Sequence, residues 1–211
     1  MIPATFRRFP RAIALLLPAL LLLPATPARA LGPFDTVIAP VGVTDDLMGY
    51  SMASVGDVNG DGYDDLLIGL AMSDLTYWNA GAAQLYFGGP TADDVPDLVL
   101  QGAVAPSDEY GESVSAGGDL NGDGYRDFVV GAHYNDEAGY DTGKVFIYFG
   151  GPTLDNVPDL AINGYESSGQ FGHTLIGAGD LDGDGWDDLA VGAMYDATGG
   201  GGAGRVYIFR G

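Results

Sequence analysis

Residues 56–69 of the sequence read GDVNGDGYDDLLIG, and two later stretches repeat this pattern almost letter for letter. Residues 118–131 read GDLNGDGYRDFVVG, and residues 179–192 read GDLDGDGWDDLAVG. Each stretch joins a loop of Asp, Asn and Gly to a short apolar run that follows at once. A pattern that recurs at a fixed spacing is typical of a protein built from repeated supersecondary units. The three stretches therefore indicate both the architecture of the chain and the place of its chemistry.

The repeated unit extends beyond the loop in both directions. Met48-Gly49, Tyr110-Gly111 and Phe171-Gly172 precede the three loops, at spacings of 62 and 61 residues. These dipeptides mark where each unit begins. The predicted repeats are residues 48–109, 110–170 and 171–211.

Each unit contains short runs with the composition of strands. A run of small residues precedes the loop, one apolar run follows it directly, and a third covers residues 83–87 in the first unit. A Gly-Gly-Pro-Thr turn then leads to a fourth run at residues 96–100. The runs are rich in Val, Ile, Tyr and Phe and are bounded by Gly, Pro, Asn and Asp, which predicts strands. No stretch after residue 30 shows sustained helical periodicity, so we expect four-stranded antiparallel sheets.

Radial repetition of four-stranded sheets produces a β-propeller, and we predict such an all-β fold for residues 31–211. Asp35 lies fourteen residues before Gly49, as Asp97 lies fourteen residues before Gly111. Residues 34–41 are therefore expected to supply the fourth strand of the last blade. Three blades are fewer than the roughly four to eight that usually close a ring. A partial propeller, an association of copies and an open assembly remain as alternatives.

The loop spacing Asp-x-Asn/Asp-Gly-Asp-Gly-x-x-Asp predicts a metal site in every repeat. Side-chain oxygens at positions 1, 3, 5 and 9 converge on one point, the carbonyl of position 7 adds a ligand, and the glycines allow the tight turn. Ligation by oxygen alone favours Ca²⁺ over Zn²⁺, so three calcium sites are expected. The predicted ligands are Asp57, Asn59, Asp61, Tyr63 and Asp65; Asp119, Asn121, Asp123, Tyr125 and Asp127; and Asp180, Asp182, Asp184, Trp186 and Asp188.

Two other interpretations of the loops are less consistent with the sequence. An EF-hand needs a Glu at position 12 and flanking helices, whereas position 12 here is Ile68, Val130 or Val191 within an apolar run. Simple Asn-Gly or Asp-Gly hairpin turns would not require every ligand position to recur three times. Twelve of the 29 acidic residues lie in these nine-residue loops and would repel one another without a cation.

Residues 1–30 have the features of a secretory signal peptide. Arg7, Arg8 and Arg11 precede an apolar run at residues 12–23, and the sequence Ala28-Arg29-Ala30 provides small residues at a cleavage site. The apolar run is shorter than the about 20 residues that a membrane span needs. We therefore expect cleavage near Ala30, no membrane span in the mature chain, and a secreted or cell-surface location, extracellular or periplasmic.

Charge and composition limit the partners of the protein. Four of the eight basic residues and none of the acidic ones lie in the signal segment, so its removal changes the formal charge from −21 to −25. Such a surface repels phosphate backbones and anionic membranes, which excludes nucleic acid as a partner, and it attracts cations. The chain is 46% hydrophobic, so it can form a core. It has no Cys, so any additional stabilisation must come from interactions other than disulfide bonds, such as bound metal ions.

The sequence has no recognisable catalytic motif, and we predict that the protein is not an enzyme. It lacks a Gly-x-Ser-x-Gly elbow, an H-E-x-x-H helix and any Cys. His133 and His173 are interpreted as ordinary surface or strand residues. Tyr77, Trp78 and Tyr140 either form a platform for carbohydrate or peptide or simply pack against neighbouring loops, and packing is the favoured interpretation.

The Phe171-Gly172 dipeptide, the Asp180–Asp188 loop and Val191-Gly192-Ala193 resemble the FG-GAP repeat of integrin α-subunit β-propellers and of many secreted bacterial proteins. The resemblance implies a propeller with calcium in hairpin loops on one rim and adhesive or ligand-binding surfaces elsewhere. It predicts a non-catalytic cell-adhesion or ligand-binding module whose partner is an extracellular protein or glycan. Self-association that completes a propeller is a further expectation, and the propeller portion of a secreted hydrolase is the alternative function.

Overall fold

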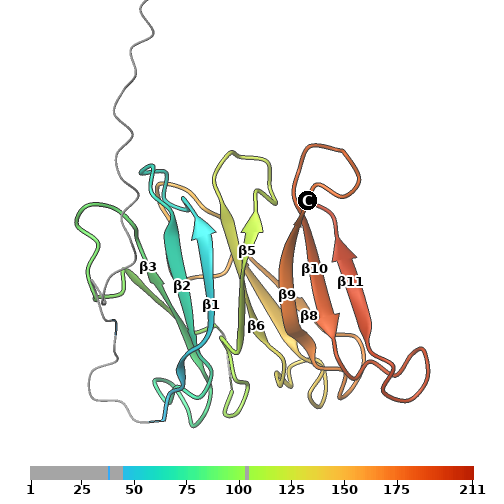
Figure 1. The fold of residues 1–211 in the computed structure, drawn as a ribbon. Coiled ribbons are helices and arrows are strands. Elements are labelled where there is room, and N and C mark those ends of the chain that lie inside the picture. The colour runs from blue at the N-terminus through green and yellow to red at the C-terminus, as the bar shows by residue number, and fades with distance from the viewer. Residues whose placement is uncertain (1–37, 39–44, 103–104) are drawn as a thin grey trace, which may run out of the picture. The chain divides into compact units, whose positions relative to one another are not determined.

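The computed structural model describes residue 38, residues 45–102 and residues 105–211, and all regular structure in these ranges is β-strand (Figure 1). The signal segment predicted at residues 1–30 lies outside the described residues. So does the strand expected at 34–41, except for Ile38, which belongs to no strand. The strands are β1 (Met48–Gly56), β2 (Asp65–Leu70), β3 (Ala82–Tyr86), β4 (Leu98–Leu100), β5 (Ser113–Gly118), β6 (Asp127–Ala132), β7 (Lys144–Tyr148), β8 (Leu160–Asn163), β9 (Phe171–Gly179), β10 (Asp188–Ala193) and β11 (Arg205–Phe209).

These strands form three antiparallel sheets in which consecutive strands are neighbours. The first sheet has the order β1-β2-β3-β4 and the second β5-β6-β7-β8, while β9-β10-β11 make a third sheet of three strands within the described part of the chain. Short connections between successive strands allow only antiparallel pairing, which explains the simple meander. The predicted all-β fold of propeller blades is confirmed.

In each sheet, the pairing of the first strand with the second has a β-bulge next to the Asp-rich loop. Gly56 pairs with Asp65, Gly118 with Asp127 and Gly179 with Asp188, after a shift in register beside each pair. The three glycines have φ values of 78°, 89° and 69°. Glycine is favoured there because other residues rarely adopt the left-handed conformation that such a bulge requires. The bulge fixes how the chain enters every loop.

Two apolar layers hold the three sheets together. The first lies between β1–β4 and β5–β8 and includes Leu67, Leu85, Phe128 and Tyr148. The second lies between β5–β8 and β9–β11 and is built around Val129, Ile147 and other buried apolar residues. Every residue of β6 and β7 is buried, because the middle sheet is covered on both faces. This agrees with the consecutive apolar residues of the second strand in the sequence.

The first strands of the sheets lie next to one another, β1 beside β5 and β5 beside β9. The Ser51 hydroxyl donates a hydrogen bond of 2.7 Å to the carbonyl of Gly111, and Ser113 makes the equivalent bond to Gly172. A Cβ added to Gly69 would lie 1.9 Å from the carbonyl oxygen of Gly111. Small residues at these positions therefore allow the backbones of adjacent sheets to touch.

No helix with the length and hydropathy of a membrane span occurs in residues 45–102 or 105–211.

Candidate metal centre

The three Asp-rich loops connect the first strand of each sheet to its second strand. They follow β1, β5 and β9 and lie along the same edge of the sheets (Figure 1). Because the two flanking strands are hydrogen-bonded neighbours, the first and ninth positions of each loop are held close together. The fold therefore presents the predicted ligands as three similar turns.

The Asp at position 1 organises the backbone of its loop. In the first loop, Oδ1 of Asp57 accepts hydrogen bonds from the amides of Gly60 (2.7 Å) and Asp61 (3.0 Å), while Oδ2 accepts from Gly62 at 2.8 Å. Gly60 and Gly62 have φ values of 79° and 93°, which glycine adopts without strain. Asp180 makes the same three contacts in the third loop, and Asp119 makes the ones to Asp123 and Gly124 in the second.

The side chains at positions 3 and 5 fold over the same turn. Oδ1 of Asn59 accepts from the amide of Asp61 at 2.9 Å, and Oδ1 of Asp61 accepts from the amide of Tyr63, also at 2.9 Å. The second and third loops repeat both contacts. Three oxygen-bearing side chains thus surround one short segment of backbone. In the first loop, Oδ2 of Asp57, Oδ1 of Asn59 and Oδ1 of Asp61 each accept one of these bonds and keep a lone pair for a further ligand.

The side chain of the Asp at position 9 points toward the interior of the protein. Oδ2 of Asp127 accepts from the amide of Leu120 at 2.7 Å and Oδ1 from Gly150 at 2.9 Å, which ties the loop to the end of β7. Asp65 and Asp188 make the equivalent contacts at distances between 2.8 and 3.2 Å. Burial raises the pKa of the Asp127 carboxyl to about 6 and also raises the pKa of Asp65. A cation beside these carboxylates would favour their charged form.

In the third loop the structure brings three of the predicted carboxylate ligands close together. Ligand oxygens of Asp180, Asp182 and Asp188 all lie within 4.8 Å of one another. Arg210 also approaches this loop, with its Nε 3.2 Å from Oδ2 of Asp182. In the other loops position 3 is Asn, and its amide donates to the position-5 carboxylate, as from Asn59 to Asp61 at 3.1 Å. The donor set of every loop is all oxygen, which fits a hard cation such as Ca²⁺.

The sequence did not reveal that neighbouring loops touch one another. A Cβ on Gly60 would lie 2.6 Å from the ring of Tyr125, so the aromatic residue at position 7 of the second loop covers position 4 of the first. Asp187 in the third loop accepts from the amide of Asp119 at 2.9 Å and pairs with Arg126 at 3.3 Å. The one signal in the sequence is the aromatic residue that recurs at position 7. The three Asp-rich loops, and with them the predicted cation sites, are therefore in direct contact.

The opposite edge of the sheets carries exposed aromatic side chains. Tyr77, Trp78 and Tyr140 lie in the β2–β3 and β6–β7 loops, and half or more of each residue is exposed, up to 68% for Tyr140. The favoured interpretation that these residues simply pack was wrong. Tyr195, in the loop after β10, is also exposed. Loops of the three sheets thus place aromatic rings on the edge that lies away from the Asp-rich loops.

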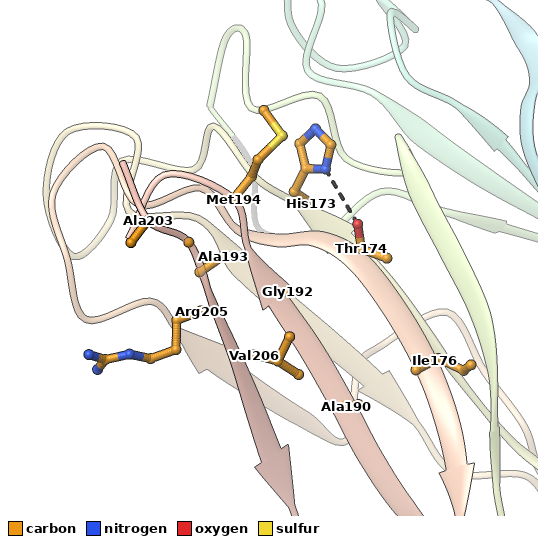
Figure 2. A pocket seen from close by; sticks show the side chains of 11 residues that line it. His173, Thr174, Ile176, Ala190, Gly192, Ala193, Met194, Ala203, Arg205 and Val206 are labelled. Carbon is orange, nitrogen blue, oxygen red and sulfur yellow. Dashed lines mark hydrogen bonds between the residues drawn. The ribbon is translucent and has the colours of Figure 1, made fainter. Parts of the chain in front are cut away.

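The outer face of the third sheet forms a pocket of about 550 Å³ (Figure 2). It is lined by Ile176 from β9, Ala190 and Gly192 from β10, and Val206 from β11, with His173 and Met194 at one end. Gly192 occupies the place that Gly69 and Gly131 occupy in the other sheets. Within the described residues, the nearest atom to a Cβ on Gly192 belongs to Thr174, at 3.3 Å, rather than to a neighbouring backbone. The apolar face therefore remains open to a partner.

Comparison with known proteins agrees with the repeat. The FG-GAP repeat model matches residues 48–86, 110–148 and 171–209. The chain is 33% identical to integrin alpha-5 of Xenopus laevis over 172 residues, which cover 79% of this chain and 15% of that protein. It is 35% identical to integrin alpha-PS2 of Drosophila melanogaster over 182 residues (79% and 12%), and 37% identical to integrin alpha-7 of Rattus norvegicus over 156 residues (71% and 13%). The chain thus spans less than a sixth of the length of these relatives.

Proposed function

The chain belongs to the FG-GAP repeat family, and on this premise we propose that it is a secreted, calcium-stabilised module for adhesion or ligand binding. The observation that carries the proposal is the recurrence of one oxygen-lined turn in all three sheets. Calcium would be a structural ion here rather than a signal, because each turn joins two strands of a blade. The protein acts by binding and carries out no reaction.

Three calcium ions would be held by the ligands that the sequence predicts. Asp57, Asp119 and Asp180 each hold their loop backbone in place, and the carboxylates at position 9 connect the loop to the following turn. Bound Ca²⁺ supplies the positive charge that offsets these clustered carboxylates. Isothermal titration of metal-free protein with CaCl₂ tests this, and three binding sites are expected. Absence of binding at millimolar Ca²⁺ would contradict the proposal.

The ligand surface is the edge that carries Tyr77, Trp78 and Tyr140. Exposed aromatic side chains on loops of a rigid scaffold are suited to recognise sugar rings or peptide side chains. Binding of the protein to arrays of glycans and to immobilised extracellular proteins tests this. Trp78→Ala and Tyr140→Ala should lose most of the binding. Val157→Ala, an exposed apolar residue on the other edge, is the matched control and should bind normally.

The partner for the open face of the third sheet is a second copy of the chain, which would complete a composite propeller. A second copy could place the start of its own β1, at Met48-Gly49, against Gly192, as Gly111 lies against Gly69 within one copy. Native mass spectrometry should show a dimer, and Val206→Glu in the pocket should convert it to a monomer. A wild-type monomer at micromolar concentration would refute this assembly.

Secretion rests on the basic and apolar segment at residues 1–30. Expression of the full chain in a bacterial host, followed by N-terminal sequencing of the protein from the periplasm or medium, tests it. We expect the mature chain to begin at Leu31. Retention of the whole chain inside the cell with an intact N-terminus would contradict secretion.

A further inference from the structure

A second group of metal-ligating side chains lies outside the Asp-rich loops. Ligand atoms of Glu109, Glu112 and His133 all lie within 4.8 Å of one another. Glu109 and Glu112 precede β5, and His133 follows β6. From this geometry we propose that the three residues form a binding site for a divalent transition metal ion of the Zn²⁺ type, distinct from the calcium loops.

The backbone holds the two segments of this site rigidly together. Tyr110, between the two glutamates, is fully buried, and its amide donates to the carbonyl of Ala80 at 2.9 Å. The amide of Gly111 donates to the carbonyl of Gly131, two residues before His133, at 2.9 Å. On the other side, the amide group of Asn135 donates to the buried carboxylate of Asp108 at 2.8 Å. The ligands therefore project from two turns that are already joined, which lowers the cost of assembling a site.

The side chains are buried in a way that calls for a cation. His133 is only 3% exposed, and its Nδ1 faces Oε2 of Glu112. That oxygen is buried, and among the described residues the contact with the imidazole nitrogen is the one that the structure gives it. Within the same residues, no Lys or Arg forms an ion pair with Glu109 or Glu112. A buried carboxylate whose charge no Lys or Arg offsets is costly, and a bound metal ion would supply the missing positive charge.

The donor set selects the class of metal. One imidazole nitrogen and two carboxylates match the mixed ligands of zinc sites, whereas calcium sites use oxygen alone. His173, at the start of β9, lies close by, with its ring centroid 5.2 Å from that of His133. Its imidazole is therefore a candidate for a second nitrogen ligand. Imidazole ligands favour Zn²⁺ and similar transition metals over Ca²⁺ and Mg²⁺.

The site opens toward solvent on one side. Glu109 lines a cavity of about 320 Å³ together with Tyr134, Tyr140 and Asp141. Tyr140 is one of the exposed aromatic residues on this edge. A metal ion at Glu109 would therefore keep a coordination position for water or for an oxygen atom of a ligand. The site lies on the proposed binding edge but does not depend on that function.

The sheet register separates this site from the calcium loops. Ser113, directly after Glu112, pairs with Gly131 at one end of β5 and β6, whereas Gly118 and Asp127 pair at the other end, next to the loop. Occupation of one site therefore need not displace the ion in the other. The two kinds of site can be loaded and tested independently.

Titration of calcium-saturated protein with ZnCl₂ in a calorimeter tests the proposal. The wild type should bind one Zn²⁺ beyond the calcium already present, and His133→Ala should weaken this binding at least tenfold. Glu109→Gln provides a second variant that alters a less buried side chain, and it should weaken binding as well. Asp94→Asn, which removes an exposed carboxylate between β3 and β4 that belongs to neither kind of site, is the matched control and should bind Zn²⁺ as the wild type does.

A spectroscopic readout separates a true site from loose association. Co²⁺ in place of Zn²⁺ should give visible absorption characteristic of nitrogen ligation and low coordination number, and His133→Ala should lose it. No Zn²⁺ binding by the wild type would overturn the proposal. Equal binding by the wild type and by His133→Ala, when circular dichroism shows both to be folded, would also overturn it.

Discussion

Trp186 in the third Asp-rich loop lies directly over Gly122 in the second. A Cβ at Gly122 would be 2.6 Å from Nε1 of the Trp186 indole, closer than any real contact allows. Tyr125 lies over Gly60 in the same way, also at 2.6 Å. Neighbouring Asp-rich loops are thus in direct contact through an aromatic residue that belongs to the predicted ligand set.

Gly122→Ala should destabilise the protein more than the same change in an uncovered loop. Both Gly122 and Gly183 have left-handed φ values, 72° and 81°, but no atom of the described residues lies within 4 Å of a Cβ on Gly183. Gly183→Ala should lower the free energy of unfolding by about 1–2 kcal/mol through backbone strain alone. Gly122→Ala should cost about 1–3 kcal/mol more, because Trp186 must move. Urea unfolding in saturating calcium measures both, and equal losses would show that the loops are not coupled.

Calcium removal should lower the melting temperature, because ions that bind only the folded chain stabilise it. An ion present at 100 times its dissociation constant contributes about 2.7 kcal/mol. Thermal unfolding followed by circular dichroism, with excess Ca²⁺ and with EDTA, gives the shift. The same melting temperature in both conditions would exclude a structural role for calcium.

The third loop should bind calcium most tightly, since it carries Asp182 where the other loops carry Asn59 and Asn121. Asp182→Asn should weaken its affinity about tenfold, or about 1.4 kcal/mol. Conversely, Asn121→Asp should raise the calcium affinity of the second loop. Arg210, which pairs with Asp182, offsets part of the extra charge, so Arg210→Gln should tighten the third site. Calorimetry on the four proteins would contradict this explanation if Asp182→Asn left every affinity unchanged.

The buried hydroxyl groups of Tyr110 and Tyr148, 2.6 Å apart, should behave as a coupled pair. Burial raises the pKa of Tyr148 to about 12 and that of Tyr110 further, so both are neutral at physiological pH. Tyr148→Phe should cost about 1–3 kcal/mol, because the Tyr110 hydroxyl would lose its partner. The double variant with Tyr110→Phe should cost less than the sum of the single losses, which a double-mutant cycle in urea measures.

The metal-free protein should lose stability as the pH rises from about 4 to 7. Burial raises the pKa of Asp127 from 3.8 in the unfolded chain to about 6 in the folded one, so the folded state binds the extra proton in this window. The free energy of unfolding therefore falls with pH until the carboxyl is charged in both states. Unfolding at pH 4.5 and pH 7 measures the slope, which Asp127→Asn should reduce. Saturating calcium should reverse the trend, since ligation requires the charged carboxylate.

Much of the fold could be predicted because its signals are local and occur three times. The four strand-like runs, the turn residues and the consecutive apolar residues of β2, β6 and β10 specify a four-stranded sheet without knowledge of distant contacts. The predicted ligands are equally local, since nine consecutive residues hold every oxygen of one loop. Calcium and its ligands stay predictions until an ion is measured, but the turn that would hold it is present in each sheet.

Contacts between repeats could not be predicted in this way. The interpretation of Tyr77, Trp78 and Tyr140 as packed residues was wrong, because exposure depends on which loop lies opposite. His133 was interpreted as an ordinary histidine, yet its neighbour Glu112 is 21 residues earlier in the sequence and reaches it only through the pairing of β5 with β6. No spacing rule within one repeat indicates such a pair.

The Asp-rich loop that opens each stretch of the repeated pattern thus determines the blade by itself. It fixes the turn, the two strands that flank it and the oxygen atoms that would face the predicted cation. Tertiary structure alone decided how the blades touch, with Trp186 over Gly122, Ser51 bonded to Gly111, and Glu109, Glu112 and His133 brought to one point. The physical reason is distance along the chain. Local turns depend on neighbouring residues, whereas these contacts join side chains from separate strands and appear only when the sheets stack.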